Sequence, residues 1–161
     1  MKILFVSLGC DKNLVDTEMM LGMLREKGFE FTDDETEADI VVVNTCCFIG
    51  DAKEESINTL LEMAQLKQEG RIQALLAAGC LAQRYREEIQ KEIPEVDAIL
   101  GTMAIEEICA AVEEVLAGKS KNHYRELNSV PATYKDRVVT TGGHFAYLKI
   151  AEGCNKRCTY C

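Results

Sequence analysis

The sequence lacks the features that mark several common classes of protein. No apolar run approaches the roughly 20 residues that span a membrane, so we expect no transmembrane helix. No apolar stretch with a small-residue cleavage site stands near the start, so we expect a cytoplasmic protein. Internal repeats, low-complexity tracts and a G-x-G-x-x-G phosphate loop are also missing. The last of these absences argues against a flavodoxin-like nucleotide-binding protein.

The sequence has enough residues for one domain, and its charge is distributed unevenly. At 161 residues, the chain can bury about two thirds of its unfolded surface in one core without disulfides. Residues 119–161 hold eight Lys and Arg against three acidic residues; because the total charge is −9, residues 1–118 carry −14. So acidic a body does not support nucleic-acid binding, although it could attract a basic protein. A solvated acidic surface is the simpler interpretation.

Short apolar runs alternate with helical patterns over residues 1–118. The runs at 2–8, 39–44, 73–79 and 97–100 are typical of strands buried on both faces, and 29–32 predicts a minor edge strand. Four stripes with helical spacing lie between or after them: Val15, Met19 and Met23; Ile57, Leu60, Leu61 and Ala64; Tyr85, Ile89 and Ile93; Ile105, Ile108, Cys109, Val112, Val115 and Leu116. This alternation predicts a three-layer α/β domain of the flavodoxin or Rossmann type, with a parallel sheet and right-handed crossovers.

The pattern changes after Gly118. Residues 119–143 contain Pro131, the pair Gly142–Gly143 and no sustained helical period, so they predict a linker or a strap across the domain. Residues 144–161 begin with an apolar run, 146–150, that predicts the first strand of a second domain. We therefore divide the chain into 1–118, 119–143 and 144–161.

Three cysteines each follow the end of a predicted strand: Cys10, Cys46 and Cys80. In a parallel sheet this edge binds ligands, and because strands lie about 4.8 Å apart, three strand ends can converge within ~10 Å. Such convergence predicts a metal centre, although a lone cysteine is often a small buried hydrophobe. Gly9 and Gly79, each before its cysteine, would allow sharp turns and close approach to the ligand.

Two further cysteines have less certain roles. Cys109 lies on the apolar stripe of the last predicted helix, so we expect it in the core. Cys47 follows Cys46 directly and is a bystander, an alternative ligand or a redox neighbour.

The last three cysteines, Cys154, Cys158 and Cys161, form a Cys-x-x-x-Cys-x-x-Cys run. Zinc sites of this kind normally need a fourth ligand nearby, and none follows in the sequence. Three thiolates suit three irons of a cubane cluster, which leaves the fourth iron open to a substrate or cosubstrate.

Four stretches in order resemble the radical S-adenosylmethionine methylthiotransferases: "SLGCDKNLVDTE", "NTCCFIGDAKEES", "GCLAQRY" and "GCNKRCTYC". The first two are most similar to the RimO-type branch, which modifies a ribosomal protein. The resemblance implies that Cys154, Cys158 and Cys161 bind a 4Fe–4S cluster that chelates S-adenosylmethionine, with Tyr160 beside this cofactor. It implies a second 4Fe–4S cluster, carrying the sulfur to be inserted, on Cys10, Cys46 and Cys80.

The resemblance also implies a reaction and partners. The product would be a β-methylthio aspartate on a small-subunit ribosomal protein, with electrons from a flavodoxin-like donor. The chain would be an amino-terminal fragment that stops after the first strand of the radical barrel and is inactive alone. One alternative is a tRNA adenosine methylthiotransferase, and another, of a different class, is a non-catalytic iron–sulfur or zinc binding module.

Overall fold

The sheet is five-stranded and entirely parallel, as predicted. The computed structural model describes residues 1–126, 128–129 and 136–159. The strands are β1 (Lys2–Ser7), β2 (Glu30–Thr32), β3 (Ile40–Thr45), β4 (Ala74–Ala78) and β5 (Ala98–Leu100), in the order β2-β1-β3-β4-β5. Every residue of β3, β4 and β5 is buried, as expected of apolar strands covered on both faces. The predicted edge strand is also present, as β2.

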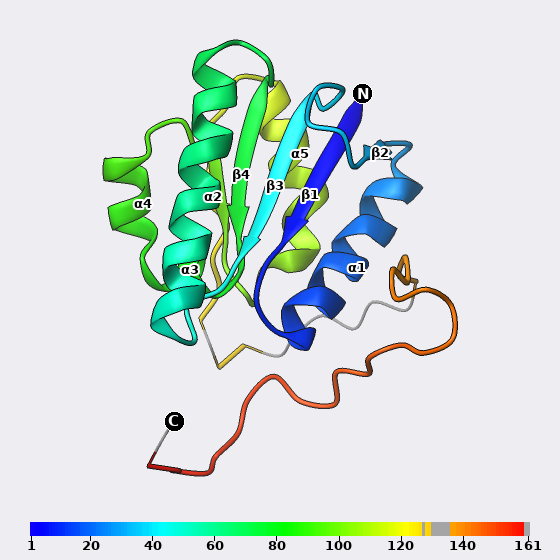
Figure 1. Cartoon of the computed structure of the whole chain (residues 1–161), viewed down its shortest axis with the longest axis vertical. Coiled ribbons are helices and arrows are strands. Elements are labelled where there is room, and N and C mark those ends of the chain that lie inside the picture. Colours follow the sequence, from blue (N-terminus) through cyan, green and yellow to red (C-terminus); the bar gives the residue numbers. More distant parts are fainter. Residues whose placement is uncertain (127, 130–135, 160–161) are drawn as a thin grey trace.

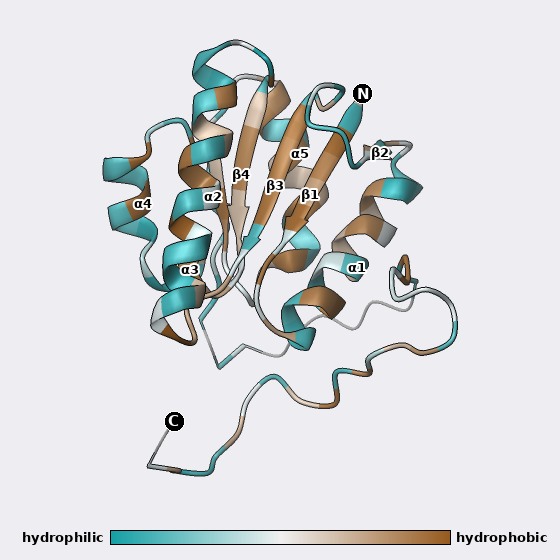
Figure 2. Ribbon diagram, viewed as in Figure 1, coloured by the Kyte–Doolittle hydropathy of each residue, from teal (hydrophilic) through white to brown (hydrophobic). Residues whose placement is uncertain are grey.

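Helices cover both faces of this sheet (Figure 1). They are α1 (Asp11–Glu26), α2 (Gly50–Gln68), α3 (Gly79–Arg84), α4 (Arg86–Glu92), the short 3-10 helix η1 (Ile105–Glu107) and α5 (Ile108–Leu116). Helices α1 and α5 pack with Ile40, Val42 and Leu76 on one face. Helices α2, α3 and α4 pack with Val41, Val43 and Leu75 on the other. Apolar colour accordingly concentrates on the strands and the inner sides of the helices (Figure 2).

Three details of the predicted helices differ from the structure, the first being Leu116, the last residue of α5, which was assigned to an apolar stripe but is 38% exposed. Leu61 was assigned to the buried stripe of α2, but it is 48% exposed, because neighbouring helical residues point about 100° apart and Leu60 takes the inward position. The stripe Tyr85, Ile89 and Ile93 does not lie on one helix: α3 ends just before Tyr85, whose backbone leaves the helical region, and α4 ends one residue before Ile93. Ile89 and Ile93 are buried as expected.

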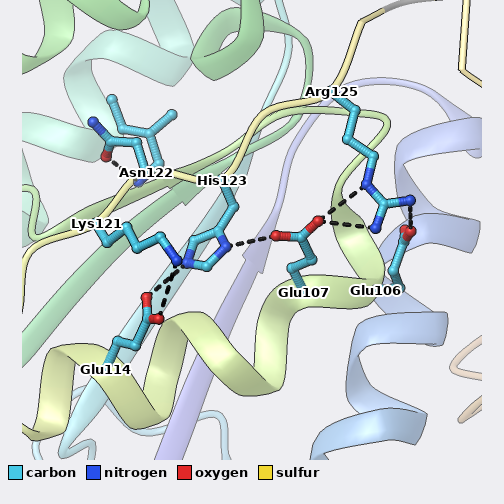
Figure 3. A network of polar contacts seen from close by, with 8 residues as sticks. Glu106, Glu107, Glu114, Lys121, Asn122, His123 and Arg125 are labelled. Atoms are coloured by element: carbon cyan, nitrogen blue, oxygen red, sulfur yellow. Dashed lines mark hydrogen bonds and ion pairs between the residues drawn. The ribbon is translucent and has the colours of Figure 1, made fainter.

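After α5 the chain extends the sheet by a single residue, His123. Its backbone N–H donates to the carbonyl of Ile99 at 2.9 Å, and its carbonyl accepts from Gly101 at 2.9 Å. The buried imidazole lies between two carboxylates, with Nδ1 2.7 Å from Glu107 and Nε2 3.0 Å from Glu114 (Figure 3). Only a doubly protonated ring can donate to both. These hydrogen bonds attach residues 119–126 to α5 and to the 3-10 helix η1.

The same network affects the acidic side chains around it. Burial acts to raise the pKa of Glu107, but hydrogen bonds from His123 and Arg125 outweigh it and lower that pKa overall. Arg125 also pairs with Glu106 (Figure 3). The side chain of Asn122 accepts from the Ile99 N–H at 3.0 Å. Residues 119–126 are therefore attached to the domain through its backbone as well as through its side chains.

Residues 136–141 lie across the outer side of α1. Glu18, which is 1% exposed, accepts from the backbone N–H and hydroxyl of Thr140 at 2.6 and 3.0 Å, and Arg137 lies 3.5 Å from its other oxygen. The Glu18 carbonyl accepts from the Val138 N–H at 3.0 Å. Gly22 lies directly beneath Asp136, where a Cβ would collide with backbone atoms. The packing of residues 136–141 on α1 therefore depends on two residues of that helix, the buried carboxylate of Glu18 and the glycine at position 22.

The strand predicted at 146–150 is not formed, which corrects that expectation. Residues 142–144 form a turn, and 145–150 make no ladder bonds. The neighbouring surface is α1, whose backbone groups are already used within the helix, so no strand edge is available for pairing. Side chains hold the segment instead: the Lys149 ammonium lies 2.5 Å from Asp16 and also pairs with Glu152.

Among the described residues, no helix combines the length and apolar character needed to cross a membrane.

Candidate metal centre

Cys10, Cys46 and Cys80 lie at the same edge of the sheet, the edge toward which the arrowheads of β1, β3 and β4 point (Figure 1). Cys10 is the residue just before α1, Cys46 directly follows β3, and Cys80 is the second residue of α3. Three neighbouring strands therefore each deliver one thiol to the edge at which parallel sheets bind ligands. The predicted position of these cysteines in the fold is confirmed.

Tight turns at two glycines bring the loops together. Gly9 has φ +90°, and a Cβ there would lie 2.5 Å from Cβ and 2.6 Å from Sγ of Cys46, so the first loop packs directly on the second. Gly79 also has φ +90° and forms an isolated bridge with Thr45, which extends the pairing of β3 and β4 as far as Cys46 and Cys80. Both sharp turns were predicted, and glycine adopts such φ values without strain.

Asn13 joins all three loops, and sequence reasoning missed it. Its buried amide nitrogen donates to the carbonyls of Leu8 and Thr45, each at 3.0 Å. Its amide oxygen lies 3.7 Å from the sulfur of Cys80, within reach of an S–H donor. The only signal in the sequence was an asparagine, a weak helix former, in the first turn of a helix.

Buried polar side chains fix the backbone around Cys46. The Ser56 hydroxyl accepts from the Cys46 N–H at 2.9 Å and donates to its carbonyl at 3.0 Å. Thr45 donates its hydroxyl proton to the Ala78 carbonyl at 2.6 Å, which ties β3 to the start of α3. Asn44 donates to the Asn13 carbonyl at 2.8 Å. Because each of these groups is buried and has a partner, removing one leaves an unsatisfied group beside a cysteine.

The thiols differ in exposure and in acidity. Cys10 is exposed, Cys46 is buried and Cys80 is half-buried. Burial, followed by the charges of Cys47, Cys46 and Cys10, raises the pKa of Cys80 to about 11. The thiol of Cys80 is therefore neutral at pH 7, and a cation that binds here must displace its proton.

The sulfurs of Cys10, Cys46 and Cys80 are not arranged as a ligand set in this structure. Within the described ranges, no three His, Cys, Asp or Glu side chains are placed to hold a metal ion. The structure brings Cys10, Cys46 and Cys80 to one edge of the sheet by their positions in the fold.

Three helices begin at this edge without a side-chain cap. The N-cap residues of α1, α2 and α3 are Cys10, Ile49 and Ala78, and none makes a side-chain capping hydrogen bond. Free N–H groups and the positive ends of the helix dipoles stabilise negative charge nearby. The helix ends therefore act to stabilise negative charge at this edge, although burial and the neighbouring cysteines outweigh that effect at Cys80, whose pKa is raised.

An open groove of about 700 Å³ lies beside two of the cysteines. Its lining comes from the end of β1 with the loop to Cys10, from Cys46, and from the start of α2, including Phe48, Ile49, Asp51 and Glu55. Phe48 is 73% exposed and Ile49 is 57% exposed. A ligand of considerable size can therefore reach the cysteines from this side.

Of the two remaining cysteines of residues 1–118, Cys47 is close enough to Cys80 to influence its pKa, whereas Cys109 packs against the core away from the strand ends. Burial raises the pKa of Cys47, although Arg84 and Lys53 act to lower it. The Lys53 ammonium lies 4.1 Å from the centre of the Tyr85 ring, so this side of the edge carries cations and an aromatic ring. Cys109 is half-buried against the core between α1 and α5, close to its predicted place.

Cys154 and Cys158, from the second group of cysteines, lie in a segment without helix or strand. Cys154 and Cys158 are exposed, and the Lys156 N–H donates to the Cys154 sulfur at 3.3 Å. Tyr160 and Cys161, which the sequence also assigned to this site, lie outside the described residues. Upstream, burial raises the pKa of Asp16 to about 6 even though Lys149 bonds to it. This pair is the last buried contact before Cys154.

The fold and this edge define a class: a parallel α/β domain with thiols at three neighbouring strand ends. The model of the uncharacterized protein family UPF0004 matches residues 2–101, which include the whole sheet and Cys10, Cys46 and Cys80. The chain belongs to this family.

Curated relatives carry a more specific name. The chain is similar to proteins named ribosomal protein uS12 methylthiotransferase RimO from Lachnoclostridium phytofermentans (58% identity over 100% of this chain) and Pelotomaculum thermopropionicum (52% over 99%). It spans 37% and 36% of the length of these two relatives. Among solved structures, a de novo designed Rossmann 2x3 fold protein aligns with 80% of this chain and 98% of its own, with TM-score 0.47 and 20% identity.

Proposed function

We propose that the chain is the amino-terminal part of a radical S-adenosylmethionine enzyme that methylthiolates the β-carbon of an aspartate in ribosomal protein uS12. The observation that carries the proposal is the convergence of Cys10, Cys46 and Cys80 at the ligand-binding edge of the sheet. The names of the relatives supply the substrate. A cytoplasmic location and a flavodoxin-like electron donor belong to the same proposal.

The donor groups at this edge suit an iron–sulfur cluster. Soft thiolates select iron–sulfur clusters or zinc, and the uncapped helix ends favour the negative charge that a thiolate-bound cluster carries. Three thiols and an adjacent groove would leave one iron accessible, as a cluster that carries sulfur to a substrate requires. We assign one 4Fe–4S cluster to Cys10, Cys46 and Cys80.

We assign a second 4Fe–4S cluster to Cys154, Cys158 and Cys161, with S-adenosylmethionine beside Tyr160. Once bound, these cofactors supply C–H activation and the sulfur to be transferred. The contribution of this chain is positioning: Asn13 and Ser56 hold the loops of the first site, and the Asp16–Lys149 pair anchors the segment that leads to the second.

Metal content tests the proposal directly. The protein is reconstituted anaerobically, and its iron, sulfide and electron spin resonance spectra are compared with those of Cys10→Ala/Cys46→Ala/Cys80→Ala and Cys154→Ala/Cys158→Ala/Cys161→Ala. Each triple variant should lose about four irons, the content of one 4Fe–4S cluster. Cys109→Ala, a cysteine of the core, is the matched control and should lose none. Unchanged iron in the first triple variant would refute the strand-end site.

The two alternatives give different results. A non-catalytic module would hold zinc, or a cluster whose spectrum does not respond to added S-adenosylmethionine. A tRNA adenosine methylthiotransferase would, with the rest of the enzyme attached, modify tRNA and leave uS12 unchanged. The acidic body of residues 1–118 favours the protein substrate over tRNA.

A further inference from the structure

We propose that the groove beside Cys10 and Cys46 is a docking surface for a basic segment of the protein substrate. Phe48 and Ile49 would supply its apolar contact, and Asp51 and Glu55 its charged rim. We call these four residues the α2 rim. The inference rests on the proposed function, and it names the surface on this chain that recognises the substrate.

The α2 rim and the cysteines border the same groove. The groove is lined on one side by the loop from Ser7 to Cys10 together with Cys46, and on the other by the α2 rim. The rim begins only two residues after Cys46, whose backbone is held at both N–H and carbonyl by Ser56, the seventh residue of α2. The rim is therefore fixed relative to the cysteines rather than carried on an independent loop.

The apolar part of the rim is unusual for a surface. Phe48 and Ile49 are adjacent in the sequence and are the two most exposed large apolar side chains in the described part of residues 1–126. A single exposed apolar residue needs no explanation, but an adjacent exposed pair beside a groove marks a binding surface. Covering a side chain of this size contributes about 1.5–3 kcal/mol.

The charge of the rim indicates what kind of partner it fits. Asp51 and Glu55 lie one helical turn apart, and neither has an ion-pair partner within the described residues. An RNA phosphate would be repelled here, whereas Lys and Arg would be attracted. A ribosomal protein supplies such side chains, because it must neutralise the phosphates of ribosomal RNA. Charge complementarity therefore favours a basic protein segment as the occupant.

Docking in this groove would place the substrate against the thiol edge. A segment that covers Phe48 and Ile49 reaches Cys10 and Cys46 within the same groove. Binding energy from residues that do not react would then hold the reacting side chain near the sulfur to be transferred.

The test measures the binding of purified uS12 to this chain by calorimetry at low and raised salt. Phe48→Ser/Ile49→Ser should weaken binding about tenfold or more, as expected for the apolar centre of an interface. Asp51→Asn/Glu55→Gln should weaken it severalfold and reduce its salt dependence, because fewer ion pairs form. The matched controls lie on α2 outside the groove: Leu61→Ser, 48% exposed, and Glu54→Gln/Glu62→Gln, with the same change in charge.

Three results would overturn the inference. One is binding that the control variants weaken as much as the rim variants do. Another is equally tight binding of a polylysine peptide, which would show attraction by charge alone. The third is an absence of binding by the wild-type chain. Circular dichroism and thermal unfolding check that each variant is folded. Because the iron measurement uses no uS12, loss of iron in the cysteine variants together with any of these results would remove the docking surface and leave the proposed function standing.

Discussion

The two groups of cysteines are held in different ways. Cys10, Cys46 and Cys80 come from three distant parts of the sequence and are placed by a buried parallel sheet and by side chains such as Asn13. Cys154 and Cys158 are close in the sequence and exposed, and the segment before them is anchored to α1 by a few polar contacts. The first group therefore depends on the whole fold, and the second on local spacing and on a few polar contacts.

The largest expected difference between the two regions is in stability. Leu76, on β4, is completely buried, and Leu76→Ala should lower the free energy of unfolding by about 3 kcal/mol, because it loses apolar burial and leaves a cavity. Leu148→Ala, in the segment before Cys154 and 81% exposed, should change it by less than about 0.5 kcal/mol. Denaturant unfolding measures both. Comparable losses would show that the segment is as much part of the fold as the sheet.

Asn13 tests whether side chains beyond the cysteines determine the first site. Asn13→Ala leaves the carbonyls of Leu8 and Thr45 without their donor, which should cost about 1–3 kcal/mol. Iron bound by the first group should fall, while iron bound by the second should not. Asn13→Asp, of the same shape but without the donor, should behave like the alanine variant. Asn58→Ala, exposed on α2, is the control. Normal iron in both Asn13 variants would limit this residue to a role in packing.

Glu18 tests the attachment of the second region. Glu18→Ala removes the buried acceptor of Thr140 and the partner of Arg137, so residues 136–150 should separate from α1. Faster amide hydrogen exchange at Thr140, by about tenfold per 1.4 kcal/mol of lost protection, is the expected signal. Glu18→Gln keeps the acceptor and should have a smaller effect. Exchange that is unchanged in Glu18→Ala would mean that other contacts hold the segment.

The last test of the second region is the pH dependence of the Asp16–Lys149 contact. Burial raises the pKa of Asp16 from 3.8 to about 6, so between these values the folded chain binds a proton that the unfolded chain has released. This group therefore makes the protein less stable as pH rises from about 4 to 6. Asp16→Asn should remove that fall when unfolding is measured across the window. Titration of the Asp16 carboxyl near its ordinary pKa, as seen by nuclear magnetic resonance, would contradict the assignment.

The sequence predicted the parts of the fold that arise from strong local patterns. Buried strands and amphipathic helices have distinct periods, and a parallel sheet follows from their alternation, so the shared edge of Cys10, Cys46 and Cys80 could be inferred. Asn13 could not, because its function depends on carbonyls 5 and 32 residues away that only the folded sheet brings within reach. The strand expected at 146–150 is not formed in the described residues, because the surface beside it is α1, which offers no free strand edge for pairing.

The parallel order of the sheet also sets a sequence of events during synthesis. The register pairs Ile3 with Ile40 and Ile40 with Ala74. Strand β1 can therefore pair only after β3 has been synthesised, and β3 can complete its pairing only after β4 has been synthesised. Each pairing closes a long crossover before its contacts form, which makes parallel sheets slow to assemble. Cys10 leaves the ribosome well before Cys80, yet the two share an edge only after β4 has joined. On the proposed function, assembly of the first cluster therefore follows the folding of β1, β3 and β4 into one sheet.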